Sequence, residues 1–343
     1  MENIKTIEEV SRFGKGLIPQ DISHLPTYGA LLGATPFNYA GDYSFTVPFV
    51  INNQNGSSSC TGQGAQGLNQ VFSYEKTGTL QVGSARWLYD HTFLPGGGAM
   101  AIAPINYLLS NGIPDDSVFP SEPETEANME SIAGITTEVT ANAQQHNIYK
   151  GMVATQIPVT MDEIANAILN DYCVDMCVSN GSNAGWTTAD VRPPIAGEET
   201  WGEGHAFLGV LPMIRNGKPC IKFANSWGSG EEGWGDDGFG YLYQDYFDAG
   251  LVSAAIVVTP NFIPQHMTQE QVNSLYAAVF HRIADASSAG YVGQTLEFVL
   301  NAFMTSPEWM AYDATERRGL GNCDGARKIS AIMCRRFWSR YCP

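Results

Sequence analysis

Basic side chains are scarce in this chain of 343 residues. Eighteen lysines and arginines stand against 35 aspartates and glutamates, which gives a formal net charge of −17 at neutral pH. This balance argues against a general nucleic-acid binder, because a strongly acidic surface repels the phosphate backbone. The end of the chain differs, since seven basic and three acidic residues follow from position 313 onward. We therefore do not expect nucleic acid as a partner of the main body.

The chain also lacks long apolar stretches. No run of eighteen apolar residues occurs, and residues 1–10 mix charged with apolar side chains, unlike the unbroken apolar core of a secretory signal. The sequence therefore predicts no membrane span and synthesis in the cytoplasm. It leaves the final location open, a virion included.

Cysteines number seven, an odd count, so at least one thiol stays unpaired within a monomer. Cys60 is our candidate for that thiol. Cys173 and Cys177 fall on one face of a predicted strand with no histidine at ligand spacing, which favours structural thiols over a metal site. Asp236 and Asp237 lack the ligand periodicity of a calcium loop. We expect no metal and no cofactor, and a disulfide within the tail stays an open alternative for Cys323, Cys334 and Cys342.

Periodicity predicts helices first and strands later, the order typical of an α+β protein. Residues 1–50, rich in glycine, proline and aromatics, are expected to form an extended segment that wraps the core. Residues 51–260 are expected to form the main domain, and residues 261–343 a C-terminal helical module. Within the main domain we predict helices at 60–76, 101–110 and 161–169, and strands at 172–178, 206–214, 219–224, 239–243 and 252–259. The acidic stretches 122–130 and 198–203 are predicted to be solvated loops.

The predicted helix at 60–76 carries three glycines, at 62, 64 and 67. Each weakens a helix by about 1 kcal/mol relative to alanine, so their presence indicates a buried helix with close backbone packing. Ser58 or Ser59 is expected to cap its start.

Cys60, at the start of this helix, meets the requirements of a nucleophile. A thiol attacks as the thiolate, and a helix N-terminus together with an imidazolium stabilises that anion. His205 is the expected base, and Asn225, twenty residues later, could accept a hydrogen bond from its ring. Gln54, just before the nucleophile, could donate its amide to a developing oxyanion, and Trp227 could shield the His–Asn hydrogen bond from water.

Three motifs carry a resemblance to a known family: Gln54-Asn55-Gly56-Ser57-Ser58-Ser59-Cys60, then Gly204-His205-Ala206, then Asn225-Ser226-Trp227-Gly228. In this order they resemble the papain-like cysteine peptidases over about residues 15–258. Thr61 after the nucleophile is similar to the prokaryotic and viral branch of that family.

The resemblance implies a helical lobe with Cys60 and a β-rich lobe with His205 and Asn225, with substrate between them. It implies a thiol endopeptidase acting on peptide or protein substrates, with Gly97, Gly98, Gly204 and Trp227 contacting substrate. Ser58 departs from the family's glycine two residues before the nucleophile and is expected to narrow the primed side of the cleft. Only about 50 residues precede Gln54, so we expect no helical inhibitory prosegment of the length seen in secreted relatives.

A second reading stays open beside the peptidase. Residues 272–309 are similar to a small helical module found at the ends of bacterial surface proteins and phage structural proteins, which favours attachment to a protein partner for the C-terminal module. Under this alternative the chain is a catalytically silent papain-fold component of a phage particle or surface assembly.

Overall fold

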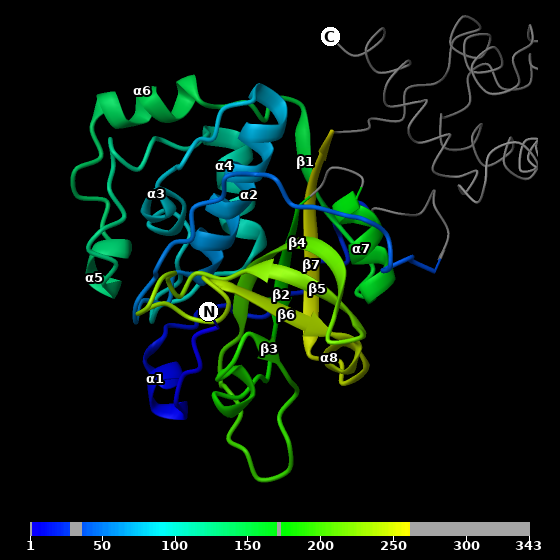
Figure 1. Cartoon of the computed structure of the whole chain (residues 1–343). Coiled ribbons are helices and arrows are strands. Elements are labelled where there is room, and N and C mark those ends of the chain that lie inside the picture. Colours follow the sequence, from blue (N-terminus) through cyan, green and yellow to red (C-terminus); the bar gives the residue numbers. More distant parts are fainter. Residues whose placement is uncertain (1, 28–35, 170–172, 261–343) are drawn as a thin grey trace, which may run out of the picture. The chain divides into compact units, whose positions relative to one another are not determined.

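The computed structural model describes residues 2–27, 36–169 and 173–260, which belong to one compact unit. Most of the helices gather on one side and a mixed sheet on the other, with helix α2 between them (Figure 1). The predicted C-terminal helical module, residues 261–343, lies outside the described residues.

Helix α2 (Cys60–Thr77) is buried along most of its length. The helices on its side of the molecule are α3 (Ala85–Tyr89), α4 (Ile102–Asn111), α5 (Glu126–Met129) and α6 (Thr137–Gln145). Gly112 ends α4 at φ 72°, a conformation that glycine adopts without steric cost. The predicted helices at 60–76, 101–110 and 161–169 are thus confirmed to within a residue at each end, the last as α7 (Met161–Leu169).

The sheet has seven strands in the order β1-β7-β2-β4-β5-β6-β3. They are β1 (Met152–Gln156), β2 (Val174–Val178), β3 (Asp190–Val191), β4 (His205–Arg215), β5 (Lys218–Ala224), β6 (Phe239–Tyr243) and β7 (Val252–Pro260). All neighbouring pairs are antiparallel except β3 with β6. Asn216 and Gly217, both at positive φ, form the two-residue turn between β4 and β5. The 3-10 turn η1 (Ala184–Trp186) and helix α8 (Gln244–Asp248) complete this side.

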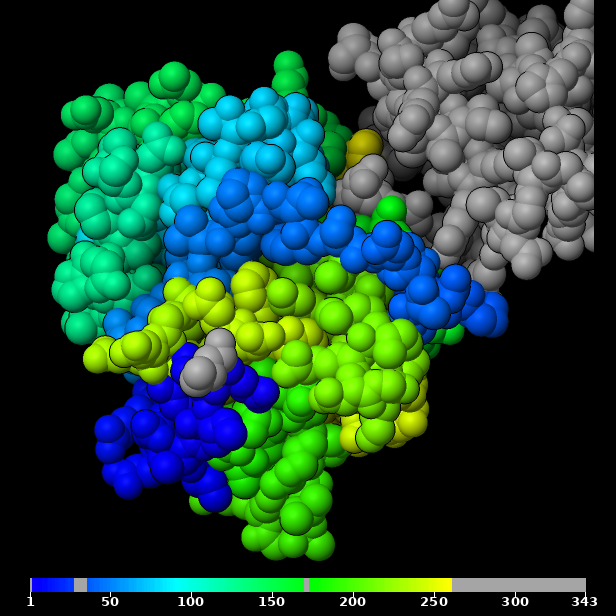
Figure 2. Space-filling model, viewed as in Figure 1, coloured from blue at the N-terminus to red at the C-terminus, as the bar shows by residue number. Residues whose placement is uncertain are grey.

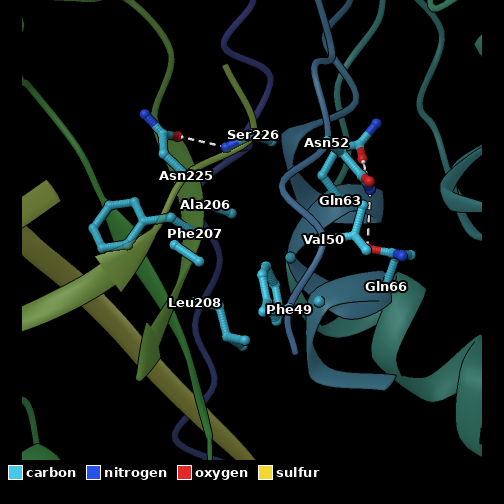
Figure 3. A pocket seen from close by; sticks show the side chains of 13 residues that line it. Phe49, Val50, Asn52, Gln63, Gln66, Ala206, Phe207, Leu208, Asn225 and Ser226 are labelled. Carbon is cyan, nitrogen blue, oxygen red and sulfur yellow. Dashed lines mark hydrogen bonds between the residues drawn. The ribbon is translucent and has the colours of Figure 1, made fainter. Parts of the chain in front are cut away.

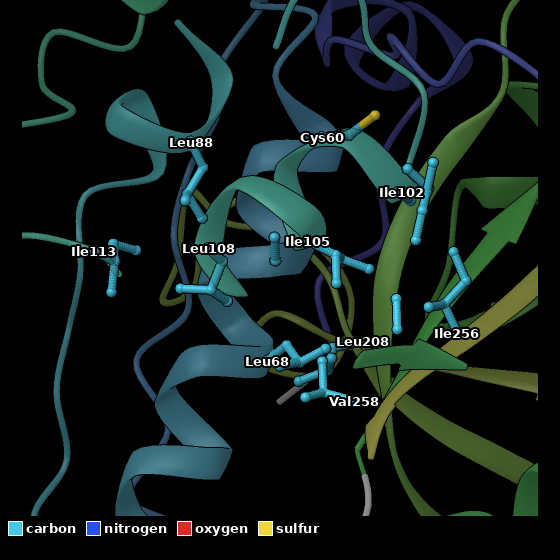
Figure 4. Close-up of a cluster of buried hydrophobic side chains, with 14 of the residues drawn as sticks. Cys60, Leu68, Leu88, Ile102, Ile105, Leu108, Ile113, Leu208, Ile256 and Val258 are labelled. Carbon is cyan, nitrogen blue, oxygen red and sulfur yellow. The ribbon is translucent and has the colours of Figure 1, made fainter. Parts of the chain in front are cut away.

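One hydrophobic core fills the interface between α2, α4 and the sheet. Figure 4 shows Leu68 of α2 and Ile105 and Leu108 of α4 beside Leu208, Ile256 and Val258 of the strands. A second core on the sheet side is rich in aromatic rings, with Trp186, Trp227 and Trp234 all fully buried.

The glycines of α2 allow its backbone to approach its neighbours, as the sequence indicated. A Cβ added at Gly62 would lie 2.9 Å from the carbonyl oxygen of Ala85, and one at Gly64 would lie 2.3 Å from Oδ1 of Asp175 on β2. No side chain larger than hydrogen fits at Gly64 unless Asp175 moves.

The predicted serine cap was wrong. Ser59 precedes α2 but its side chain makes no capping hydrogen bond. Several other elements escaped prediction, among them α1 (Ile7–Arg12), begun by a capping box between Thr6 and Glu9, and the short helices α5 and α6, each begun by a threonine whose side chain accepts a backbone N–H. Strand β1 was also missed, whereas the five predicted strands are confirmed as β2, β4, β5, β6 and β7.

Within the described ranges, no helix is both long and apolar enough to cross a membrane.

The N-terminal segment is fastened to the sheet side before it reaches α1. Asn3 forms a β-bridge with Gly235, and the carboxylate of Glu2 accepts hydrogen bonds from the Ala189 N–H and from Arg215. Figure 2 shows the N-terminal residues, in dark blue, lying against green and yellow side chains of the sheet.

We predict that Asp175 makes the fold less stable as the pH rises above about 4. The residue is fully buried and neither carboxyl oxygen has a hydrogen-bond partner, and burial raises its pKa well above the usual value. The carboxyl ionises freely only in the unfolded chain, so stability is lost as pH rises above about 4. Asp175→Asn should gain stability over the wild type by up to about 1.4 kcal/mol per pH unit above that point.

Denaturant unfolding from pH 4 to pH 8 measures this gap. Asp42→Asn, at an exposed position, is the control and should follow the wild type. A gap between Asp175→Asn and wild type that stays constant with pH would show that the carboxyl is already ionised in the fold.

Candidate active site

Cys60 is the first residue of α2 and is 0% exposed. Interactions with the backbone of Ala206, Gly16 and Thr61 favour the thiolate, but burial outweighs them and raises the pKa of the thiol to about 11. The thiol is therefore neutral at physiological pH in this structure.

His205 opens β4 and Asn225 follows the end of β5, so the β4–β5 hairpin brings them together. Nε2 of His205 lies 2.8 Å from Oδ1 of Asn225, and the same oxygen accepts the N–H of Ser226. An accepting oxygen requires a donating Nε2, which assigns the proton to Nε2 and leaves Nδ1 as the basic atom. Nδ1 is buried and has no hydrogen-bond partner among the described residues.

The ring of Trp227 stacks on His205 with centroids 4.6 Å apart, and Phe13 stacks on Trp227 at 5.0 Å. His205 is 0% exposed as a result of such packing. Burial lowers its pKa to about 3, although the hydrogen bond to Asn225 opposes the shift and the charge of Lys15 adds to it. Both Cys60 and His205 are thus uncharged, whereas a thiol nucleophile needs the charged pair.

Gln54, fully buried, lies on the loop before Cys60. Its Oε1 accepts the hydroxyl of Ser226, which fixes the amide, and its Nε2 donates to the carbonyl oxygens of Ser57 at 2.8 Å and Gly14 at 3.1 Å. The carbonyl of Gly14 also accepts the indole N–H of Trp227 at 3.3 Å. The Gln54 amide, the donor expected to stabilise an oxyanion, is therefore already bound to the carbonyl of Gly14, a residue of the chain itself.

That carbonyl belongs to residues 14–18, which we call the strap. Leu17 of the strap exchanges two backbone hydrogen bonds with Gly204, of 3.1 and 2.9 Å. On the other side the Ile18 N–H donates to Ala99 and the Ala99 N–H donates to Gly16. The strap therefore lies between Gly204 and Ala99 as a β-strand would, antiparallel to Gly204 and parallel to Ala99. We call the backbone at these two residues the Gly204 wall and the Ala99 wall. The strap covers Cys60.

Two strap glycines allow this close contact. A Cβ on Gly14 would lie 1.7 Å from the carbonyl oxygen of Ser57, and a Cβ on Gly16 would lie 1.9 Å from that of Ser58. Backbone atoms cannot rotate aside as a flexible side chain does. Glycine is required at both positions for the strap to lie on the nucleophile loop.

Lys15, between the two glycines, turns toward the sheet side. Its ammonium donates to the carbonyls of Val10 and Phe13 and lies 5.1 and 5.3 Å from the ring centroids of Trp201 and Trp227. Burial lowers its pKa to about 8, while Cys60 and Glu203 favour its charged form. The strap thus carries a cation into the surroundings of His205, where a second positive charge is disfavoured.

The four residues expected to contact substrate, Gly97, Gly98, Gly204 and Trp227, differ in what they contact in this structure. Gly204 pairs with the strap and Trp227 donates to it, as a peptide in the cleft would require. The backbone N–H of Gly98 instead bonds the hydroxyl of Tyr89, and Ala99, which the sequence did not single out, makes the pairing on that wall. A Cβ on Gly97 would lie 3.4 Å from Oγ of Ser58, so these two residues are neighbours. The expected narrowing of the primed side by Ser58 stays a prediction.

The prediction of solvated acidic loops was wrong at three glutamates. Glu124 is 5% exposed and burial raises its pKa to about 8, and Gln63 donates to it. Glu126 accepts the backbone N–H of Ser58. Glu198 is held by Arg192, whose hydrogen bonds lower the carboxyl pKa to about 2.

A small cavity lies behind the site, between α2 and strands β4 and β5 (Figure 3). Its volume of about 20 Å³ has room for a single water. This cavity is too small for a peptide. In the part of the chain that the structure describes, no three His, Cys, Asp or Glu side chains converge as metal ligands would.

No protein-family model and no curated protein matches the sequence. Solved structures do match. Xylellain, a cysteine protease from Xylella fastidiosa, is 18% identical with a TM-score of 0.58, over 76% of this chain and 98% of that one. The chain has the papain-like fold. A procathepsin B (S9) from Trypanosoma congolense matches at 15% identity and a TM-score of 0.52, over 74% of this chain and 89% of that one. The predicted papain-like α+β fold is thereby confirmed, and identities this low establish the papain-like fold alone.

We predict that the strap protects Cys60 from alkylation. Gly16→Ala places a Cβ against the Ser58 carbonyl and should displace the strap, which hydrates Cys60 and lowers its pKa. Iodoacetamide should then label Cys60 about tenfold faster or more, because the thiolate is the reactive form. Labelling is followed at pH 7.5 by mass spectrometry of the Cys60 peptide.

Gly202→Ala is the matched control, since a Cβ there meets no atom within 4 Å. If Gly16→Ala stays folded and Cys60 is labelled at the wild-type rate, the strap is not what protects the thiol.

Proposed function

We propose that this chain is a cysteine peptidase, an endopeptidase, that is latent while the strap occupies its cleft. The observation that carries the proposal is the seating of a peptide segment against both walls, with one carbonyl on the Gln54 amide and an amide on the Cys60 sulfur. A cleft that holds a peptide in this way next to a thiol and an oriented histidine suits hydrolysis of peptide bonds.

In the proposed reaction His205 takes the Cys60 proton at Nδ1, and the thiolate attacks the substrate carbonyl carbon. The Gln54 amide and the Cys60 backbone N–H stabilise the oxyanion. The tetrahedral intermediate collapses as His205 gives its proton to the leaving amine, which leaves a thioester on Cys60. Water, deprotonated by His205, then attacks the thioester and releases the carboxylic acid and the free thiol.

Asn225 and Trp227 are proposed as positioning residues. The hydrogen bond from Nε2 to Asn225 holds the tautomer in which Nδ1 is the base, and the stacked indole keeps the ring in place. The bond also favours imidazolium, because the protonated ring donates more strongly.

Displacement of the strap is the step that this proposal requires before catalysis. It removes Lys15 from the surroundings of His205 and admits water, and both changes favour the imidazolium and the thiolate. In the closed structure His205 is held by Asn225, and both His205 and Cys60 are uncharged.

Two finer hypotheses rest on sequence alone. Because Thr61 follows the nucleophile, we place the chain in the prokaryotic and viral branch of the papain-like peptidases. Residues 261–343 are proposed as the module that binds a protein partner. The next experiment also has an outcome that would favour the alternative, in which the chain is a catalytically silent structural component.

We predict that hydrolysis depends on Cys60 and Gln54 once the strap is displaced. In the Gly16→Ala background, Cys60→Ala should abolish cleavage of a diverse peptide library. Gln54→Ala should lower kcat/KM by about 100-fold or more, the usual loss for one oxyanion donor. Cleavage is measured by mass spectrometry of the products.

Cys173→Ser in the same background is the control thiol, half-buried beside Leu68, and should retain activity. A Gly16→Ala protein whose Cys60 reacts with iodoacetamide but which cleaves no peptide would favour the silent structural component.

A further inference from the structure

Glu124 is a buried carboxyl group beside the first turn of α2. It is 5% exposed, and its Oε2 accepts a hydrogen bond of 2.9 Å from Nε2 of Gln63, in the same turn as Cys60. Among the described residues, no lysine or arginine forms an ion pair with Glu124. The hydrogen bond from Gln63 therefore ties this carboxyl to the helix that carries the nucleophile.

Both ends of the Gln63 amide are used. Its Nε2 also donates to Oγ of Ser59 at 3.3 Å, and its Oε1 accepts Nδ2 of Asn52 at 2.8 Å (Figure 3). An amide donates through nitrogen and accepts through oxygen, so an acceptor at Glu124 and a donor at Asn52 fix its orientation. The carboxyl of Glu124 thereby keeps a donor against Ser59.

From Ser59 the hydrogen bonds continue to Gln54. Oγ of Ser59 lies 2.8 Å from Oγ of Ser57, and the Ser57 hydroxyl donates to the backbone carbonyl of Gln54 at 2.8 Å. Since Ser57 spends its one proton on Gln54, the hydroxyl of Ser59 must donate to Ser57 and accept from Gln63. These four residues are all 4% exposed or less, so water does not compete for the bonds.

This chain of hydrogen bonds runs through the loop that carries two groups of the proposed reaction. Gln54 stands at the start of the loop and Cys60 at its end, with Ser57 and Ser59 between them. A group of this kind has to be held within about 0.5 Å of its productive position. A shift of Ser57 would move the backbone to which the Gln54 amide is attached.

We propose that Glu124 is a positioning residue, which holds the loop of Gln54 and Cys60 in place through Gln63, Ser59 and Ser57. The inference rests on the proposed peptidase function and adds a residue to its machinery. Glu124 itself touches none of the reacting atoms and acts through the hydrogen-bonded chain.

The carboxyl is protonated in the fold at neutral pH. Burial raises its pKa to about 8, the charges of Glu122 and Asp116 add to the shift, and the hydrogen bond from Gln63 opposes it more weakly. A protonated carboxyl keeps a carbonyl oxygen that accepts Gln63. Glutamine has the same acceptor and no charge, so Glu124→Gln preserves the contact, whereas Glu124→Ala removes it.

The first test measures peptide cleavage in the Gly16→Ala background. Glu124→Ala should lower kcat about tenfold or more with little change in KM, because a misplaced oxyanion donor weakens the transition state and not the bound substrate. Glu124→Gln should restore kcat to within about twofold of the parent. Glu138→Ala, at an exposed glutamate of α6, is the control and should equal the parent.

Ser59→Ala cuts the same chain by loss of one hydroxyl, a small change that the fold should tolerate. It should lower kcat by about as much as Glu124→Ala, and the double variant should be no slower than either single variant. Losses that multiply in the double variant would show that the two residues act independently. A kcat of Glu124→Gln as low as that of Glu124→Ala would show that the hydrogen bond is not what matters.

Hydrogen exchange tests the position of the loop without any catalysis. In the protein with its strap in place, Glu124→Ala should speed exchange of the Ser57 amide, which bonds the Gln54 carbonyl, about tenfold as measured by NMR. Amides of β7 should exchange as in the wild type, and so should Ser57 in Glu124→Gln. Unchanged exchange at Ser57 in Glu124→Ala would overturn the positioning role, whereas absence of cleavage in the Gly16→Ala parent would refute the peptidase.

Discussion

The contact of helix α2 with the sheet is the constraint on which the site depends. Cys60 is the first residue of α2, and the backbone of Ala206, one residue after His205, favours its thiolate. The two lie together because Gly64 allows the helix backbone to rest on β2 and β4, where a methyl group would strike Asp175. Three helix-weakening glycines, each costing about 1 kcal/mol, are thus explained by geometry.

Burial then decides the charge state of the site. The packing that buries Cys60, His205 and Asn225 excludes water from them, and the strap pairs with Gly204 and Ala99 next to them. Thiolate and imidazolium are both penalised in such surroundings, whereas their neutral forms are not. The hydrogen bond between His205 and Asn225 is therefore compatible with an uncharged histidine.

Much of the fold and of the candidate site could be predicted from the sequence. The features that could not be predicted share one cause, contacts between residues far apart in the sequence. Helices and strands with a clear period, such as 60–76 and 239–243, follow from local pattern, and Gln54, Cys60, His205 and Asn225 follow from residue type and order. Gly14, Lys15 and Gly16 could not be assigned, because their role exists only where residues 57 and 58 meet them. Glu124 and Glu126 likewise look like solvated charge until the fold brings Gln63 and Ser58 to them. A Thr-x-x-Glu signal at Thr6 and Glu9 was present for α1 and was missed.

The fastening of the N-terminal segment has a consequence for how long the cleft can stay open. Glu2 and Asn3 bind the sheet side upstream of the strap, and Gln156 binds residues 25 and 26 downstream of it. In the proposed peptidase, a strap tethered at both ends would compete with substrate as an intramolecular ligand, at an effective concentration on the order of millimolar for short tethers. Ordinary peptides at micromolar concentration would displace it only transiently. One cut in the chain between residue 3 and the strap would remove a tether and turn a reversible opening into a lasting one.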